Sequence, residues 1–206
     1  MCNLYHSSTP QELMRRLFSR LSDRAVNLEP GDIYPDRLGP IIRHGEGEGW
    51  DLVKARWGMP SPPQFHSKSG RDAGVTNIRN VASTHWRRWL GPEHRCLVPV
   101  DRFSEPGADK RPAWFAPVDG APMFFAGIET RGWTSIRKVK DGETVDNLFG
   151  FLTCAPNAEV GAVHPKAMPV ILRTPGEWDA WMHAPWDIAK HLQRPLPDGA
   201  LQLVDV

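Results

Sequence analysis

Proline is the residue that most restricts how this chain can fold. The chain has 20 proline and 18 glycine residues among its 206, spread from Pro10 to Pro197. Proline lacks a backbone N–H and interrupts helices and central strands, so the regular elements must be short and joined by many turns. The length is still sufficient to bury a substantial core. We therefore expect one domain, over residues 1–206.

Short apolar runs between turn residues predict strands along most of the chain. These runs are residues 40–43, 50–57, 95–100, 113–117, 122–128, 148–154, 168–172 and 201–206. The pairs Asp119-Gly120 and Asp141-Gly142 are typical of hairpin turns. The pattern favours an α+β fold: a mostly antiparallel, barrel-like sheet assembly with helices at its edges.

Three segments are expected to be helical. Thr9-Pro10-Gln11-Glu12 is a capping-box sequence, and a stripe at helical spacing follows it (Leu13, Met14, Leu17, Phe18, Leu21). A second capping box begins at Thr174, and residues 77–90 read as a turn followed by a helix. Residues 23–37 and 58–76 read as loops, and the second is long enough to suggest a functional loop.

The net charge of +1 conceals a local imbalance. Residues 53–95 carry a net charge of +6 and the remainder −5. The cations are Lys54, Arg56, Lys68, Arg71, Arg79, Arg87, Arg88 and Arg95. Aromatic residues (Trp57, Phe65, Trp86 and Trp89) alternate with them. A basic stretch with interleaved aromatic side chains indicates a nucleic-acid-binding surface, although such a run can also be a solvated face.

The three cysteines, Cys2, Cys96 and Cys154, lie far apart and have no metal-ligand spacing. This pattern predicts a reducing compartment, no disulfide framework, no metal and no cofactor. The chain has no apolar run of 18 residues. We expect a soluble, cytoplasmic protein that is monomeric and does not bind membranes.

Met1-Cys2 is the sequence feature with the most distinctive chemistry. Aminopeptidases remove an initiating methionine that precedes a small residue, which would leave Cys2 with a free α-amine beside its thiol. The reference pKa values of these groups are about 7.7–8.0 and about 8.5, so both react near neutral pH. The amine can form a Schiff base with an aldehyde, and the thiol can close that imine to a five-membered thiazolidine. An internal cysteine cannot do this.

Several short segments resemble the SOS-response-associated peptidase (SRAP) family, in order and at similar spacing over residues 1 to about 182. They are Met1-Cys2, Trp57-Gly58, Asn77-Ile78-Arg79, Arg95-Cys96-Leu97-Val98-Pro99, Phe103-Ser104-Glu105, Ala126-Gly127-Ile128 and His164-Pro165-Lys166-Ala167-Met168-Pro169. The resemblance implies covalent capture of abasic sites in single-stranded DNA, through a thiazolidine between Cys2 and the ring-opened deoxyribose. It also implies removal of Met1 and an associated strand-cleaving lyase activity.

The same resemblance assigns roles by position. Cys2 is the nucleophile and crosslinking residue, and Asn77 holds the N-terminal cysteine and the opened sugar. Glu105 is the site carboxylate, and His164 is the imidazole that transfers protons.

The resemblance also implies four DNA contacts. Arg79 contacts a backbone phosphate, and Arg87, on a looser alignment, and Lys166 add to it. Phe65 is the nearest substitute for the tryptophans that wedge DNA in the family. The chain departs from the family at Cys2-Asn3-Leu4, where the usual Cys-Gly-Arg supplies an early arginine.

Two other functions remain open from the sequence. An N-terminal cysteine also serves as the nucleophile of amidohydrolases of the glutamine amidotransferase type. A non-catalytic single-strand-binding module, in which Cys2 is incidental, would also explain the basic stretch. Such a module would release DNA at high salt, whereas a thiazolidine would survive salt and denaturant.

Overall fold

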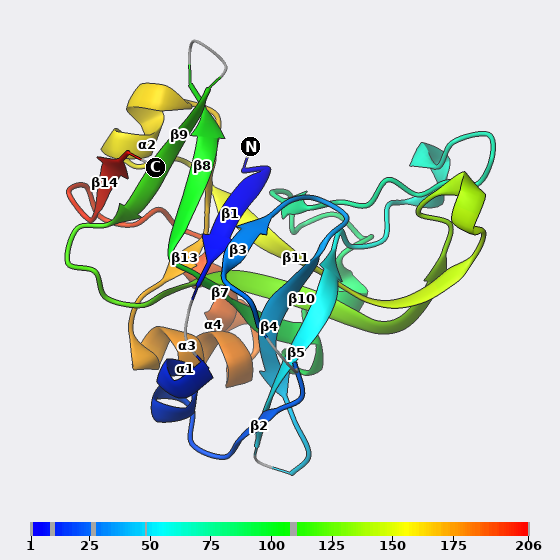
Figure 1. Cartoon of the computed structure of the whole chain (residues 1–206), viewed down its shortest axis with the longest axis horizontal. Helices are drawn as coiled ribbons and strands as arrows, with labels where there is room; N and C mark the ends of the chain where they lie inside the picture. Colours follow the sequence, from blue (N-terminus) through cyan, green and yellow to red (C-terminus); the bar gives the residue numbers. More distant parts are fainter. Residues whose placement is uncertain (1, 9–10, 26–27, 48, 108–110, 206) are drawn as a thin grey trace.

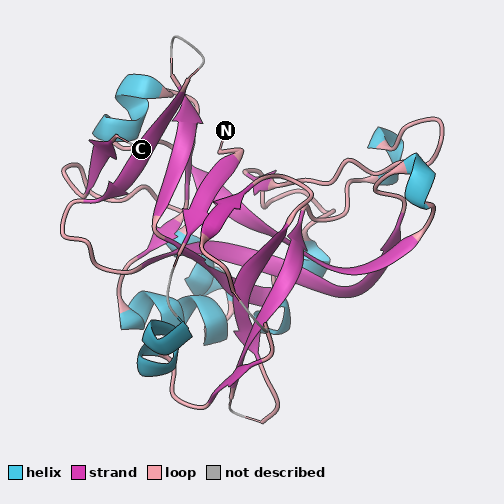
Figure 2. Ribbon diagram, viewed as in Figure 1, coloured by secondary structure: helices cyan, strands magenta, loops and turns pink. Residues whose placement is uncertain are grey.

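Strands joined by turns make up much of the molecule (Figure 1), and all but two of the described strands have eight residues or fewer, as the proline content predicts. A computed structural model describes residues 2–8, 11–25, 28–47, 49–107 and 111–205. Figure 2 shows that strands dominate and that the helices lie at the periphery. The α+β class with a barrel-like, mostly antiparallel sheet is confirmed.

A closed five-stranded barrel forms the centre of the fold. Its strands are β4 (Leu38–His44), β5 (Trp50–Trp57), β7 (Arg95–Val100), β10 (Met123–Ser135) and β11 (Thr144–Cys154). Neighbouring strands are antiparallel except β5 and β11, whose parallel pairing closes the barrel. The short strands β2 (Leu21–Asp23), β6 (Asn77–Ile78), β12 (Met168–Pro169) and β13 (Ile171–Leu172) attach to these five. The barrel therefore brings residues near 77, 150 and 168 to one place.

A second sheet lies beside the barrel, in the order β14-β9-β8-β1-β3. Its strands are β1 (Leu4–Ser7), β3 (Gly31–Ile33), β8 (Arg102–Pro106), β9 (Pro112–Pro117) and β14 (Leu201–Val204). β1 is antiparallel to β8, with Leu4 opposite Ser104 and Tyr5 opposite Phe103. This register brings the N-terminal segment next to Glu105.

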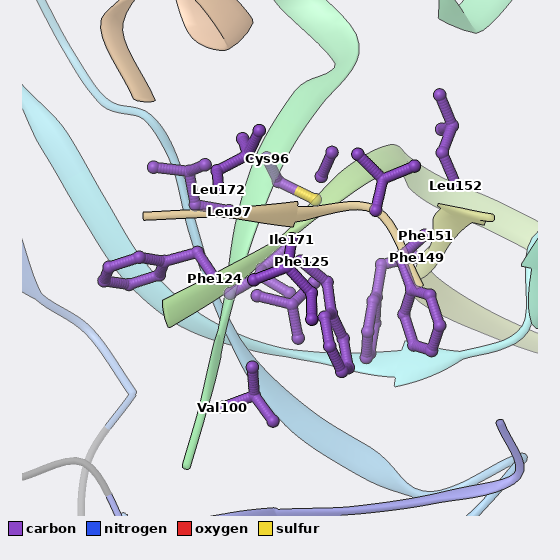
Figure 3. Close-up of a cluster of buried hydrophobic side chains, with 14 of the residues drawn as sticks. Cys96, Leu97, Val100, Phe124, Phe125, Phe149, Phe151, Leu152, Ile171 and Leu172 are labelled. Carbon is purple, nitrogen blue, oxygen red and sulfur yellow. The ribbon is translucent and has the colours of Figure 1, made fainter. Parts of the chain in front are cut away.

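The interior of the barrel is filled by the apolar faces of its strands. Figure 3 shows aromatic and aliphatic side chains from β7, β10, β11 and β13 packed together. Phe125 and Phe151 lie with ring centroids 4.5 Å apart, and Tyr5 of β1 contacts both rings edge-on. Tyr5 thus joins the second sheet to the barrel core, which fixes β1, and the cysteine before it, against the barrel.

The helices are short, and two of the three predicted helical regions contain one. They are α1 (Gln11–Leu17), α2 (Ala158–Val163), α3 (Pro175–His183) and α4 (Trp186–Ala189). The Thr174 capping box is confirmed, because the Thr174 hydroxyl accepts from the Glu177 N–H and Glu177 accepts from the Thr174 N–H. The first capping box includes Thr9 and Pro10, which lie outside the described residues. The stripe after it ends early, since Arg20 has a φ of 60° and Leu21 lies in β2.

Three predicted elements are wrong. Residues 77–90 do not contain a long helix: Asn77 and Ile78 pair with β11, and only Arg87–Trp89 forms a 3₁₀ turn. The segment 23–37 contains the strand β3, which pairs with β1. Asp119-Gly120 does not close a hairpin, because β9 and β10 belong to different sheets. Asp141-Gly142 does turn between the paired strands β10 and β11.

No helix in the described part of the chain is long and apolar enough to cross a membrane.

Candidate active site

Cys2 lies two residues before Leu4, the first residue of β1, and is completely buried. Its carbonyl oxygen accepts a hydrogen bond of 2.8 Å from Nδ2 of Asn77. The Cys2 thiol lies 3.5 Å from the carbonyl oxygen of Leu4, to which it donates. Burial raises the pKa of the Cys2 thiol far above its usual range, and the nearby Glu105 carboxylate raises it further. The thiol is therefore protonated at neutral pH and needs a base to become a nucleophile.

Asn77 connects Cys2 to the barrel. It lies on β6, opposite Phe151 of β11, and only 9% of it is exposed. Its Nδ2 donates to Thr76 Oγ1 as well as to Cys2. Its Oδ1 is buried and has no hydrogen-bond partner within the described residues. A buried amide oxygen without a donor costs free energy, so it is an acceptor available to a ligand hydroxyl.

Glu105 and His164 face each other from different elements. Glu105 lies on β8 and is 1% exposed, while His164 follows the last residue of α2. The distance from His164 Nε2 to Glu105 Oε2 is 3.8 Å, which is ion-pair range and longer than a hydrogen bond. The pair is therefore close enough for proton transfer through a bound group or a water.

The pKa values of this pair are shifted in opposite directions. Burial raises the pKa of Glu105 to about 7, and the backbone N–H of Cys2 partly opposes the rise. Burial lowers the pKa of His164, and the Lys166 ammonium contributes to the lowering. Near neutral pH the imidazole is therefore mostly neutral and the carboxyl group exchanges its proton readily. A carboxyl group with a pKa near the working pH is suited to acid–base catalysis.

Two of the four predicted DNA-contacting residues lie at this site. Arg79 directly follows β6 and is exposed. Burial raises the pKa of Cys154 on β11, and the positive charge of Arg79 lowers that pKa by a smaller amount. Lys166 is exposed and acts on His164. The structure thus brings Arg79 close to Asn77 along the chain, and Lys166 close to His164.

The other two predicted contacts are not joined to the cluster by any described interaction. Arg87 is exposed in the 3₁₀ turn Arg87–Trp89. Phe65 is 73% exposed and lies in the 3₁₀ turn Pro63–Phe65, within the long loop 58–76 that connects β5 to β6. Because Asn77 is the residue after this loop, Phe65 is on a segment that ends beside the site.

Four side chains of the basic, aromatic stretch are buried in the core. Trp57, Trp86 and Trp89 are core residues with at most 7% exposure. Arg95 is fully buried, and its guanidinium donates to the carbonyl oxygens of Leu90, Trp181 and Ala184. The interpretation of these four side chains as part of a nucleic-acid surface is therefore wrong. Their pattern resembled such a surface because sequence alone does not distinguish a stacking tryptophan from a core one.

Thr153 is a candidate that sequence reasoning missed. It lies on β11 one residue beyond Leu152, which pairs with Ile78, and is 1% exposed. Its hydroxyl has no hydrogen-bond partner among the described residues. The available signal was a hydroxyl at the end of the otherwise apolar run 148–154. Like the amide oxygen of Asn77, this hydroxyl is a buried polar group available to a ligand.

Cys2 precedes one end of β1. A cavity of about 660 Å³ lies at the other end of β1, lined by residues that include Ser7, Asp32, Gly39 and Lys54. Within the described ranges, no three His, Cys, Asp or Glu side chains come together as metal ligands do.

Comparison with known proteins gives a family and a fold. The family model described as SOS response associated peptidase (SRAP) matches residues 1–206. No relative is found among curated proteins. A crystal structure of a protein from Bordetella bronchiseptica matches with a TM-score of 0.73 and 24% identity, over 100% of each chain. One from Bacteroides thetaiotaomicron matches with a TM-score of 0.74 and 19% identity, over 98% of this chain and 92% of the other. A phage-related protein from Bordetella bronchiseptica matches with a TM-score of 0.72 and 21% identity, over 100% and 94%. These likenesses show a shared fold.

Proposed function

The chain belongs to the SOS response associated peptidase family, and we propose that it captures abasic sites in single-stranded DNA through Cys2. Family membership supports a peptidase-like role associated with the response to DNA damage. The observation that carries the more specific proposal is the grouping of Cys2, Asn77, Glu105 and His164 from four distant segments. Asn77 bonds Cys2, Glu105 acts on the Cys2 thiol, and His164 lies 3.8 Å from Glu105.

The reaction begins with hydrolysis of the Met1–Cys2 peptide bond, which consumes one water and gives Cys2 an α-amine. That nitrogen already belongs to the backbone group that interacts with Glu105. The amine then adds to the aldehyde carbon of the ring-opened deoxyribose, and the carbinolamine loses water to give an imine. The thiol sulfur adds to the imine carbon, and the thiol proton ends on nitrogen. The product is a thiazolidine between Cys2 and the DNA.

The neighbouring groups supply what each step needs. Glu105, with a pKa of about 7, can take a proton from the Cys2 ammonium or thiol and return it to the departing hydroxyl. Neutral His164 can relay a proton between Glu105 and the sugar. Asn77 Oδ1 and the Thr153 hydroxyl, both buried and unbonded within the described residues, are suited to hold the opened sugar. Before ring closure, β-elimination from the imine would remove a proton from the carbon next to the imine carbon and expel the 3′ phosphate, which cleaves the strand and is the lyase activity.

A denaturing gel tests this function. Purified protein lacking Met1, incubated with an abasic single-stranded oligonucleotide, should give a species of combined mass that survives denaturant and high salt. An oligonucleotide with an intact base, otherwise identical, should give none. A reversible DNA-binding module would give no such species with either oligonucleotide, and an amidohydrolase would instead release ammonia from glutamine.

Replacement of Arg79 with alanine is expected to weaken DNA binding and reduce its salt dependence. Loss of one phosphate contact should reduce the slope of log K against log salt by about 0.7 for single-stranded DNA. Arg87→Ala should reduce it similarly if the turn Arg87–Trp89 also contacts DNA. The measurement is affinity for intact single-stranded DNA at several salt concentrations. Lys140→Ala, an exposed cation in the turn between β10 and β11, is the control. An unchanged slope in either variant would remove that arginine from the DNA-contacting surface.

A further inference from the structure

The C-terminal segment adds to the site a group that belongs to neither β6 nor β11. Gln193 follows the 3₁₀ turn Lys190–Leu192. Its side-chain nitrogen Nε2 lies 2.9 Å from the carbonyl oxygen of Arg79 and 2.9 Å from that of Thr153. A primary amide has two N–H bonds, so one glutamine can donate to both oxygens at once.

These two carbonyls mark the place where the β6–β11 ladder ends. Asn77 pairs with Phe151 and Ile78 with Leu152, and Arg79 and Thr153 are the next residues. Since both oxygens bond the same nitrogen, they lie close together, and two carbonyl oxygens repel without a donor between them. Gln193 supplies that donor. It therefore holds Arg79 and Thr153 together beyond the last backbone pair.

The segment that carries Gln193 is itself attached to the third part of the site. Leu196 is buried in the core. The carboxylate of Asp198 accepts from the backbone N–H of Ala158 at 2.8 Å, at the first residue of α2. His164 follows the last residue of that helix. The segment 193–198 thus connects Arg79, which follows β6, with the strand that contains Thr153 and the helix that precedes His164.

We propose that Gln193 is a positioning residue for the capture reaction. Its amide fixes the backbone of Arg79 relative to Thr153, so that a DNA phosphate at Arg79 and the opened sugar at Thr153 and Asn77 are held in one geometry. The proposal rests on the proposed function, because the ligand it serves is the phosphate and sugar of an abasic nucleotide.

The test compares Gln193→Met, which keeps the length and loses both donors, with Gln202→Met, at an exposed position on β14. Single-turnover crosslinking is measured as a function of protein concentration. Gln193→Met should raise the concentration for half-maximal rate about 5- to 30-fold, as expected for one or two lost hydrogen bonds. For Gln193→Met, the slope of log K against log salt for binding intact single-stranded DNA should fall to that of Arg79→Ala. Gln193→Glu should be worse than Gln193→Met, since a carboxylate would place acceptors against both carbonyls. Gln202→Met should match the wild type.

A double variant separates positioning from general damage to the fold. If Gln193 acts through Arg79, adding Gln193→Met to Arg79→Ala should raise the protein concentration for half-maximal rate by less than about twofold. A full additional defect there would overturn the proposal, as would a Gln193→Met variant with wild-type kinetics. If Gln193→Met does not fold, Gln193→Asn replaces it, because that amide is one methylene too short to reach both oxygens. Failure of the wild type to crosslink would instead refute the proposed function.

Discussion

Replacement of Cys2 with alanine is expected to abolish the denaturant-stable adduct with abasic single-stranded DNA. The alanine variant keeps an α-amine after Met1 removal, so it can still form an imine. An imine hydrolyses reversibly, whereas a thiazolidine requires the sulfur. The adduct band should therefore fall to background on a denaturing gel. Reduction with borohydride should recover a band from the variant, because reduction traps the imine that remains.

Two controls isolate the aminothiol from the thiol alone. Cys96→Ala removes another fully buried thiol, on β7, and should still crosslink at the wild-type yield. An N-terminal tag that leaves Cys2 in an internal peptide bond should abolish the adduct even though the thiol is present, because an amide nitrogen cannot condense with an aldehyde. A Cys2→Ala protein that crosslinks like the wild type would show that another residue forms the covalent bond.

The fold was predictable where local pattern and long-range pairing agree. The barrel strands could be read from the sequence where they are apolar runs bounded by turns, and β4, β5 and β7 lie where these runs predicted. β10 and β11 contain the predicted runs 122–128 and 148–154, but β10 continues to Ser135 and β11 already begins at Thr144. Residues 77–90 were predicted to form a turn followed by a helix. Asn77 and Ile78 instead pair with β11, and side chains of Asn80 and Ser83 accept from the backbone two residues later, which stabilises turns in place of a helix. Tertiary pairing and local capping outweigh periodicity there.

The resemblance to the family identified the residues of the site, but not its geometry. The sequence indicated a thiol, an amide, a carboxyl group and an imidazole, and the structure brings Cys2, Asn77, Glu105 and His164 into one cluster. It did not indicate the direction of the pKa shifts, because these depend on burial by elements distant in the chain. Gln193 carried no signal, since its two hydrogen bonds reach 114 and 40 residues back along the sequence. Such contacts appear only once the fold is known.

Because its carboxyl group is buried, Glu105 is the residue whose replacement should most alter the pH dependence of the crosslinking rate. Burial raises its pKa from 4.5 to about 7, so Glu105 is mostly protonated at pH 6 and mostly ionised at pH 8. If the carboxylate is the base, the ratio of wild-type to Glu105→Gln rates should increase about tenfold between these pH values. The ratio cancels the titration of the Cys2 amine and thiol, which both proteins share. Single-turnover crosslinking at saturating protein gives the rates.

Stability provides the check that Glu105→Gln remains folded. A carboxyl group whose pKa is raised by folding lowers the stability of the fold as pH rises from about 4.5 to about 7, and the loss is complete above 7. Glutamine removes this ionisation, so the melting temperature of the variant at pH 8 should equal or exceed that of the wild type. A slow but equally stable variant would therefore have lost proton transfer. Glu143→Gln, at an exposed carboxylate near the β10–β11 turn, should change neither quantity.

His164→Ala is expected to slow adduct formation at saturating protein by about 10²–10⁴, the usual contribution of a general acid or base and about 3–5 kcal/mol of barrier. Because burial lowers the pKa of His164, the imidazole is neutral at pH 7 and above. The loss of crosslinking rate in His164→Ala should therefore stay constant from pH 7 to 8, whereas the loss in Glu105→Gln should grow. Affinity for intact single-stranded DNA should change little, since one lost hydrogen bond is worth about 1 kcal/mol. Wild-type rates in both variants at saturation would mean that the pair supports the fold and that the aminothiol of Cys2 reacts without it.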